Sequence, residues 1–203
     1  MAASAGRERI PFVGLTGGIG AGKSEALAAL ERLGAATLSS DAVVHELLGS
    51  DEVREQLIER FGPGIAPGGR VDRDAIARVV FERPDERSWL EAVLWPRVGA
   101  QIAAWRERLD GRSPAPRAAV VEVPLLFEAG MEAAFDHTIA VVADESTRER
   151  RAAARGHAGL ESRAARQLDQ REKAERADYV VRNDGTLEEL QQELSRLLEN
   201  MGA

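Results

Sequence analysis

A glycine-rich run near the N-terminus, GLTGGIGAGKS at residues 14–24, constrains the fold more than any other feature of this sequence. Gly17, Gly22, Lys23 and Ser24 fit the pattern G-x-x-x-x-G-K-[ST]. The run lies between an apolar, β-branched segment and a segment with helical spacing. Glycines let the backbone N–H groups of such a loop turn inward, and the helix that follows points its positive end at the same place. The run therefore predicts a phosphate-binding loop (P-loop) between a strand and a helix.

The residue types of this loop indicate a nucleoside triphosphate and a magnesium ion. In such loops the lysine ammonium, here Lys23, reaches the β- and γ-phosphates, and the hydroxyl of Ser24 ligates Mg²⁺. Only two of the 27 basic side chains are lysines, so a chain that otherwise uses arginine keeps a compact ammonium here. We expect the nucleotide to be bound by Gly17, Gly18, Gly20, Ala21, Gly22, Lys23, Ser24 and Glu25.

Five apolar runs and the segments between them predict an α/β fold. Strands are expected at residues 10–16, 35–40, 118–123, 137–143 and 178–182. The segments between these strands have helical spacing. After the last strand the sequence predicts a C-terminal helix with one apolar face, formed by Leu187, Leu190, Leu194, Leu197 and Leu198. Strands that alternate with helices form a parallel sheet, here of about five strands.

Residues 41–110 break this alternation because their pattern is wholly helical. The turn-rich stretch GPGIAPGG and a proline, Pro96, interrupt the pattern. Since proline lacks a backbone N–H, Pro96 is expected to begin a new helix. We interpret this region as a helical lobe inserted into the α/β domain.

Composition narrows the class of protein. A net charge of −7 argues against a general affinity for nucleic acid. The absence of cysteine excludes thiolate nucleophiles and thiolate metal sites. The longest charge-free run is 13 residues, below the roughly 20 that a membrane span needs, and the N-terminus has no apolar signal segment. We expect a soluble, cytoplasmic protein without nucleic-acid or membrane partners; the oligomeric state stays open, with a monomer as the expectation.

One segment, residues 145–176, has a net positive charge although the chain as a whole is acidic. It holds nine basic and six acidic side chains, a net +3. Taken alone, such a run is typical of a solvated helix with ion pairs between residues four positions apart. Beside a phosphate-binding loop it also fits a lid that supplies cations to the phosphates.

The class of reaction follows in part from missing motifs. A switch GTPase would carry D-x-x-G and N-K-x-D, and the sequence has neither. A transport ATPase would carry a second long domain with its own signature sequence. A small kinase remains, with the loop, an acidic residue after the second strand, a helical acceptor lobe and an arginine-rich lid.

Seven segments, in order and over nearly the whole chain, resemble the dephospho-CoA kinase family. They are GLTGGIGAGKS, SSDAVVHELL, GGRVDRDAIARVVF, WLEAVLWPRV, EVPLLFEAGM, RERRAAAR and RAARQLDQREKAERADYVVRNDG. This family is similar in fold to nucleoside monophosphate kinases. It transfers the γ-phosphoryl group of ATP to the ribose 3′-hydroxyl of dephospho-CoA, the last step of coenzyme A synthesis.

The resemblance implies a three-layer P-loop kinase fold within a single domain. Its nucleotide-binding core would comprise residues 9–41, 117–147 and 177–203, its acceptor lobe residues 42–116 and its lid residues 148–176. ATP is then the co-substrate and Mg²⁺ the metal, held at Ser24.

The resemblance also implies individual roles. Asp41 falls where the family places its catalytic carboxylate, and Arg151 matches the lid arginine that meets the transferring phosphate, so these two and Lys23 are the expected catalytic residues. In the lid, Arg155 and Arg163 match positions that bind ATP, and Gln167 matches a further lid position. The acceptor would be bound by Asp41, His45, Arg73, Pro124 and Leu125.

Three positions depart from the family pattern. The usual Asp-x-Asp after the second strand is Ser39-Ser40-Asp41 here, so one carboxylate is missing. His45 replaces the usual arginine four residues further on, which weakens a phosphate contact. Trp95 replaces the histidine of a His-Pro pair, and we interpret it as a core residue.

Alternatives remain for one residue and for the function. On spacing alone Asp41 fits either a base that takes the proton of the hydroxyl or the N-cap of the following helix. The departures also leave open another small-acceptor kinase of the same fold, or a nucleotide-binding regulatory protein that no longer catalyses. The intact loop and Arg151 argue against the regulatory protein.

Overall fold

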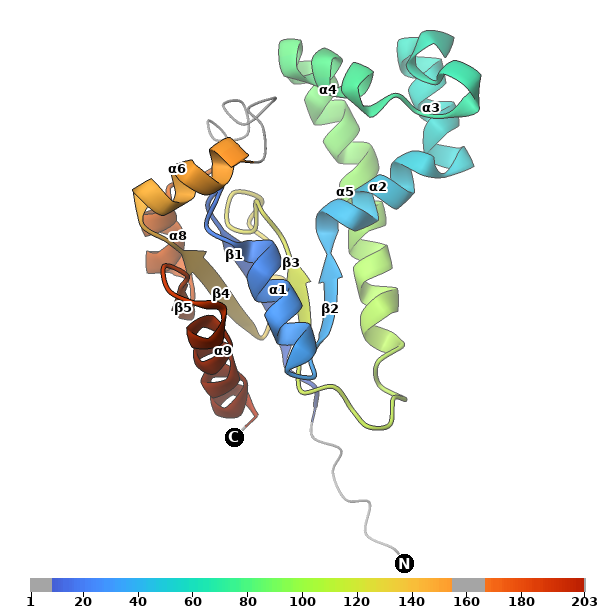
Figure 1. Cartoon of the computed structure of the whole chain (residues 1–203). Coiled ribbons are helices and arrows are strands. Elements are labelled where there is room, and N and C mark those ends of the chain that lie inside the picture. The colour runs from blue at the N-terminus through green and yellow to red at the C-terminus, as the bar shows by residue number, and fades with distance from the viewer. Residues whose placement is uncertain (1–8, 155–166, 203) are drawn as a thin grey trace, which may run out of the picture. The chain divides into compact units, whose positions relative to one another are not determined.

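The structure is a computed structural model that describes residues 9–154 and 167–202 (Figure 1). Its elements follow in the order β1 (Phe12–Gly17), α1 (Lys23–Arg32), β2 (Ala36–Ser39), α2 (Ser40–Gly49), α3 (Asp51–Phe61), η1 (Pro63–Ile65), η2 (Pro67–Gly69), α4 (Arg73–Glu82), α5 (Pro84–Glu107), β3 (Ala119–Glu122), η3 (Glu132–Ala134), β4 (His137–Val142), α6 (Glu145–Ala154), α8 (Gln170–Arg176), β5 (Tyr179–Arg182) and α9 (Leu187–Met201). Each strand lies within two residues of the position that its apolar run predicts.

The five strands form one sheet, as the sequence predicts, and their order in it is β2-β3-β1-β4-β5. The central strand β1 pairs in parallel with β3, through Val13 and Val120, and with β4, through Leu15 and Ile139. Because parallel strands end at the same edge of a sheet, the loops that follow β1, β3 and β4 lie close together there.

Alternate residues of β1 face different layers of helices (Figure 1). Val13 and Leu15 belong to a buried cluster with Leu30 of α1 and Leu194 of α9, so these two helices cover one face of the sheet. Thr16 has the opposite parity, and its hydroxyl contacts a side chain of α8. Because successive side chains of a strand point to opposite faces, α8 covers the other face. The result is the expected three-layer arrangement.

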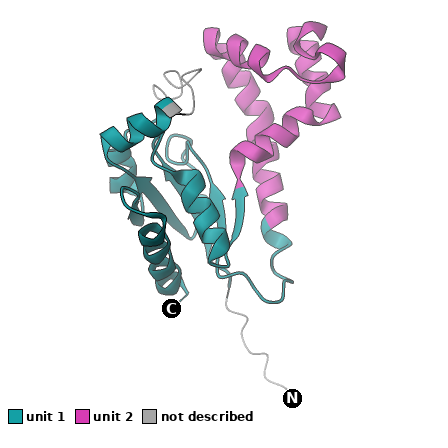
Figure 2. Ribbon diagram, viewed as in Figure 1, with its two compact units in different colours: residues 1–38, 106–203 teal, residues 39–105 magenta. Residues whose placement is uncertain are grey.

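The chain divides into two compact units (Figure 2). Unit 1, residues 1–38 and 106–203, contains the sheet with its covering helices, and unit 2, residues 39–105, is helical. The predicted acceptor lobe, residues 42–116, extends further than unit 2, because residues 106–116 group with the sheet.

Pro96 does not begin a new helix, so that prediction is wrong. The helix α5 runs through Pro96 without interruption, and its buried residues Leu90, Leu94, Val98 and Ile102 recur every four positions on both sides of the proline. A proline inside a helix costs about 3 kcal/mol. Burial of a large aliphatic side chain contributes about 1.5–3 kcal/mol, so four of them on one continuous face outweigh the break.

Two residues predicted to be buried are exposed instead. Trp95 is 51% exposed, because it lies beside the buried face of α5 rather than on it. Leu187 is 40% exposed, because it is the first residue of α9, whereas Leu190, Leu194 and Leu198 are buried as predicted.

Candidate functional site

The loop between β1 and α1 requires glycine at two positions for reasons visible in the structure. Gly20 and Gly22 have φ angles of 76° and 95°, a region that side chains disfavour. A Cβ on Gly20 would lie 2.4 Å from the carbonyl oxygen of Arg148, and a Cβ on Gly22 would lie 1.9 Å from the Nδ2 of Asn183. The loop therefore packs directly against the segments that follow β4 and β5.

The functional groups of the loop converge on its inner side. The ammonium of Lys23 donates hydrogen bonds to the carbonyl oxygens of Gly17, at 3.0 Å, and Gly18, at 3.2 Å. The N-cap residue of α1 is Gly22, which has no side chain to cap the helix, so the first N–H groups of α1 are available to an anion. Ser24 and Glu25 are exposed in the first turn of the same helix.

Two residues that sequence reasoning did not single out hold this loop in place. The Arg148 Nε on α6 donates to the carbonyl oxygen of Ile19 at 3.0 Å, and the Asn183 Nδ2 donates to that of Ala21 at 3.0 Å. Asn183 is only 4% exposed. In the sequence it looks like an ordinary turn residue in NDG, and Arg148 is one of many arginines in the basic segment, so neither carries a distinctive signal.

The predicted lid arginine, Arg151, lies on α6 beside the loop. Its guanidinium donates to the carbonyl oxygen of Asn183 at 2.9 Å, and it lies 3.5 Å from the position that a Cβ on Gly22 would occupy. Arg155 and Arg163, predicted to bind ATP, lie outside the described residues. Gln167 is described and is half-buried.

A buried lysine, Lys173, lies under the end of β1. Its side chain is fully buried on α8, and its ammonium forms an ion pair with Glu128 at 2.9 Å. It also donates to the carbonyl oxygen of Pro124 at 2.6 Å and to the Thr16 hydroxyl at 3.4 Å. Burial lowers the pKa of the Lys173 ammonium, and the hydrogen bond with Glu128 opposes that shift.

The same cluster connects the segment predicted to be a lid, at Leu168, to the sheet. One oxygen of Glu128 also accepts from the backbone N–H of Leu168 at 2.8 Å. Pro124, predicted on the acceptor side with Leu125, thus has its carbonyl oxygen engaged within unit 1, and both residues are half-buried just after β3. Sequence reasoning assigned Lys173 to the basic lid and did not anticipate its burial.

His45 and Arg73, both predicted on the acceptor side, are in contact inside unit 2. A nitrogen of the Arg73 guanidinium lies 2.5 Å from the His45 Nδ1. Because a guanidinium only donates, the Nδ1 is the acceptor and the imidazole proton is on Nε2. His45 therefore orients Arg73. The sequence did not suggest this role, because the family usually has an arginine at position 45.

Asp41 is not the N-cap of its helix, so that alternative is wrong. The helix α2 begins at Ser40, and Ser39 occupies the N-cap position. Asp41 is the second helical residue and is exposed, two positions after β2 ends. Its carboxylate therefore does not occupy the N-cap position of α2.

The residues present fit a magnesium ion that is held mainly by phosphate. Among the described residues, no group of three or more His, Asp or Glu side chains could hold a metal by itself. Mg²⁺ commonly keeps several waters and binds one or two protein oxygens together with substrate phosphates. Ser24 lies in the first turn of α1, where N–H groups are available to bind phosphate. Its exposed hydroxyl can therefore serve as a protein ligand of a phosphate-bound Mg²⁺.

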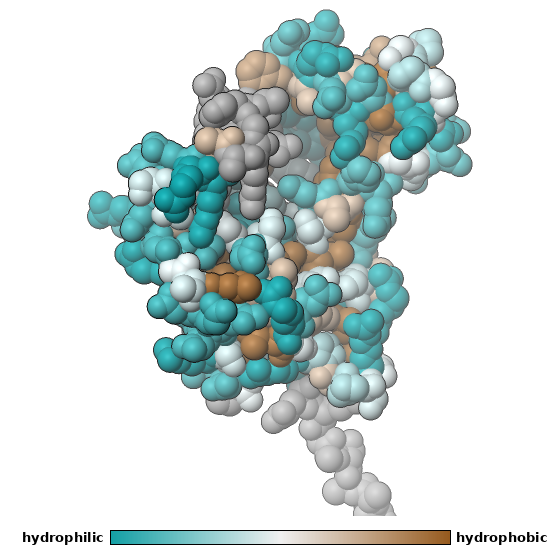
Figure 3. Space-filling model, in the orientation of Figure 1, coloured by the Kyte–Doolittle hydropathy of each residue, from teal (hydrophilic) through white to brown (hydrophobic). Residues whose placement is uncertain are grey.

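Polar side chains dominate the face of the molecule drawn in Figure 3, with apolar ones in scattered patches. Among the helices of the described residues, none is long and apolar enough to cross a membrane.

Comparisons with known sequences agree on one family. A sequence profile of the family described as Dephospho-CoA kinase matches residues 11–189. A dephospho-CoA kinase from Symbiobacterium thermophilum is 41% identical in an alignment of 184 positions that covers 87% of this chain and 75% of that protein. A dephospho-CoA kinase from Protochlamydia amoebophila is 38% identical, over 93% of this chain and 95% of its own.

Comparisons with solved structures agree on the fold. A crystal structure from Thermus thermophilus matches with a TM-score of 0.78 and 35% identity, over 95% of this chain and 98% of that one. A dephospho-CoA kinase from Campylobacter jejuni matches with a TM-score of 0.68 over 94% and 96% of the two chains. At 23% identity this second match indicates a common fold alone.

Proposed function

The chain belongs to the dephospho-CoA kinase family, and on that premise we propose how its own residues carry out the transfer of a phosphoryl group from ATP to dephospho-CoA. The observation that carries the proposal is that the ammonium of Lys23 and the guanidinium groups of Arg148 and Arg151 all lie against one glycine loop. Three cations and a row of backbone N–H groups there match the charge of a triphosphate. Phosphoryl transfer needs positioning and charge neutralisation more than covalent chemistry, which suits this arrangement.

We assign the steps at the donor side to unit 1. The loop N–H groups bind the β-phosphate, and the Lys23 ammonium exchanges its carbonyl partners for oxygens of the β- and γ-phosphates. The Ser24 hydroxyl would hold Mg²⁺ together with the phosphates, and the ion would supply neutralisation of charge on the leaving group. The guanidinium of Arg151 neutralises the charge that develops on the γ-phosphoryl group.

The acceptor side belongs to unit 2 in this proposal. Asp41 takes the proton of the 3′-hydroxyl, and His45 and Arg73 bind the acceptor. Ser39 offers a hydroxyl in place of the second carboxylate, so Mg²⁺ depends more on water. We further propose a cytoplasmic monomer with residues 148–176 as its lid.

Turnover with a panel of acceptors tests the proposed function. The protein is incubated with Mg-ATP and, in turn, dephospho-CoA, adenosine, AMP and shikimate, and ADP release is followed. We expect dephospho-CoA to have the highest kcat/KM, with coenzyme A as the product. A higher kcat/KM for another acceptor would indicate a different small-acceptor kinase, and binding of ATP without any turnover would indicate a regulatory protein.

Lys23→Ala is expected to lower kcat by about 10²-fold, because the ammonium neutralises charge on the β- and γ-phosphates. The hydrogen bonds of Lys23 to the carbonyl oxygens of Gly17 and Gly18 are made within the loop, so the melting temperature should stay close to that of the parent. Steady-state kinetics and a thermal melt of the same preparation give both values. Parent-like turnover would contradict the assignment of the phosphate loop.

Arg151→Ala is expected to lower kcat ten- to a hundredfold and to change the Kd of ATP much less, because the proposed contact strengthens in the transition state. Arg150→Ala is the matched control, since Arg150 is exposed on the same helix and, among the described residues, donates a hydrogen bond to the Thr147 hydroxyl of its own turn. If Arg151 serves only to hold Asn183, its loss should weaken ATP binding and stability and leave kcat alone. The ratio of the two effects distinguishes the roles.

A further inference from the structure

Unit 2 contains a cavity of about 210 Å³ that the proposed roles do not fully use. It lies within this unit alone and is lined by His45 and Gly49 of α2, Arg54 of α3, Gly69 and Arg70 of the turn before α4, and Arg73 of α4. A site for a whole small-molecule ligand typically has about 300–1,000 Å³, so this cavity suits one group of a larger ligand.

The cavity has a strongly positive lining. Arg54, Arg70 and Arg73 contribute three guanidinium groups, and among the described residues that line it there is no carboxylate. Residues 39–105 as a whole contain eight arginines and twelve Asp or Glu residues, a net −4. Three cations around one small cavity therefore oppose the charge of the unit that carries them.

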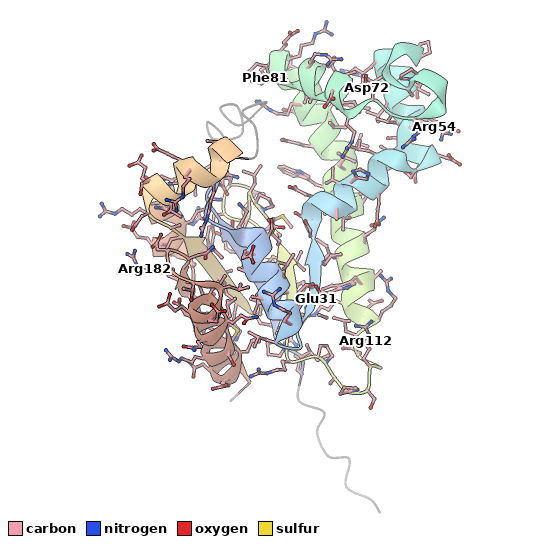
Figure 4. All side chains as sticks on the ribbon, viewed as in Figure 1. Glu31, Arg54, Asp72, Phe81, Arg112 and Arg182 are labelled. Atoms are coloured by element: carbon pink, nitrogen blue, oxygen red, sulfur yellow. The ribbon has the colours of Figure 1, made fainter. Side chains whose placement is uncertain are left out.

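Two aspartates close in sequence to these arginines, Asp72 and Asp51, leave the lining positively charged. Asp72 is occupied as the N-cap of α4, where it accepts from the backbone N–H groups of Asp74 and Ala75 at 3.0 Å. Asp51 pairs with Arg54 at 2.7 Å, but its side chain is 82% exposed, and exposed pairs of this kind contribute little. Arg70 forms no ion pair among the described residues. Figure 4 shows Arg54 on α3 and Asp72 at the start of α4.

The backbone of the cavity is open to a close approach. A Cβ added at Gly49 or Gly69 would meet no atom within 4 Å, so these positions border free space. Gly69 has a φ of 78°, which the turn before Arg70 requires. His45 holds Arg73 toward the same lining through its Nδ1. The cations are thus partly positioned before any ligand arrives.

We propose that this cavity binds the diphosphate of dephospho-CoA, the group that joins the adenosine 5′-oxygen to the pantetheine arm. The proposal rests on the proposed function and extends it to Arg54 and Arg70. Guanidinium groups bind phosphate oxygens in pairs of parallel hydrogen bonds, and such charge-assisted bonds are about twice as strong as neutral ones. The loop at residues 17–24 already serves the phosphates of ATP, so the acceptor is the substrate left with an anionic group to place.

The cavity would then select the acceptor. Adenosine presents the same ribose hydroxyl but has no diphosphate, so it would leave the guanidinium groups without a partner. A site built for a polar group discriminates strongly against an analogue that lacks it. Preference for dephospho-CoA over adenosine would depend on Arg54, Arg70 and Arg73.

Arg70→Gln is the main test, with Kd measured by titration calorimetry without ATP or Mg²⁺. We expect the Kd of dephospho-CoA to rise about tenfold, which corresponds to about 1.4 kcal/mol, and the Kd of adenosine to stay within twofold. Arg54→Gln should give the same pattern from another wall of the cavity. Arg78→Gln is the matched control, because Arg78 is exposed on α4 and does not line the cavity; it should leave both values unchanged.

Other outcomes overturn the inference. An unchanged Kd of dephospho-CoA in Arg70→Gln and Arg54→Gln would do so, as would an equal loss of affinity for adenosine, since the arginines would then shape the lobe rather than bind the diphosphate. Inorganic pyrophosphate that binds through Arg70 while dephospho-CoA does not would indicate a site for a free anion. The proposed function is judged separately, because it fails only if the parent does not phosphorylate dephospho-CoA.

Discussion

Lys173→Met is expected to lower the free energy of unfolding by about 3–5 kcal/mol, the range for removal of one partner from a buried ion pair. The methionine fills a similar volume, but the Glu128 carboxylate loses its cation. One oxygen of that carboxylate is already buried without a hydrogen-bond partner among the described residues. Charge left in such a place is costly, because the interior solvates it poorly. Chemical denaturation measures the change.

Two further variants isolate the charge as the cause. Lys173→Met/Glu128→Gln removes both charges and keeps an oxygen for the N–H of Leu168, so it should recover a large part of the lost stability. Arg171→Met on the same helix loses only an exposed pair with Glu175 and should cost about 0.5 kcal/mol or less. If the double variant is no more stable than Lys173→Met, lost packing rather than the unpaired carboxylate explains the effect.

Substitutions of the two lysines of the chain should therefore have opposite effects on activity and on stability. Substitution of Lys23 should remove activity and leave stability, whereas substitution of Lys173 should remove stability first. In the sequence, Lys23 is recognisable from the loop pattern around it. Lys173 has no local pattern, since its partners Thr16, Pro124 and Glu128 come from distant parts of the chain. Only the folded sheet brings them together.

The fold was predictable where local pattern and tertiary packing agree. Apolar runs located every strand, because a strand of a buried parallel sheet is apolar on both faces. The prediction at Pro96 failed because packing of α5 on both sides of the proline outweighs a local preference. The prediction for Trp95 failed because hydrophobicity alone does not say which face of a helix is buried.

The loop residues of the candidate site could be predicted from the sequence, whereas the residues that hold the loop in place could not. The glycines and Lys23 follow from what a phosphate requires of the backbone. Arg148 and Asn183 hold the loop by hydrogen bonds to its backbone carbonyl oxygens. Because every residue has a backbone carbonyl, the sequence contains no pattern that would indicate these contacts. Arg54 and Arg70 are scattered among acidic residues, and their shared cavity appears only when α3 and the turn before α4 are placed side by side.

Asp41→Asn is expected to lower kcat with dephospho-CoA by between about 10² and 10⁴-fold, the range for a general base. A ribose hydroxyl is a poor nucleophile near neutral pH, so its proton must be taken as the bond to phosphorus forms. Asparagine keeps the size of the side chain but cannot accept a proton. The Kd of ATP should stay close to the parent value, because the proposed nucleotide site consists of residues of unit 1.

The position of Asp41 makes this substitution a clean test. Ser39 is the N-cap of α2, so Asn at position 41 removes only a charge in the first turn, worth about 0.3–1 kcal/mol of stability. Asp85→Asn matches it, since Asp85 is an exposed first-turn aspartate of α5; it should lose the same stability and keep full activity. If Asp41→Asn and Asp85→Asn turn over alike, Asp41 acts only on its helix. The hydroxyl proton must then leave by another route, such as transfer to an oxygen of the γ-phosphoryl group itself.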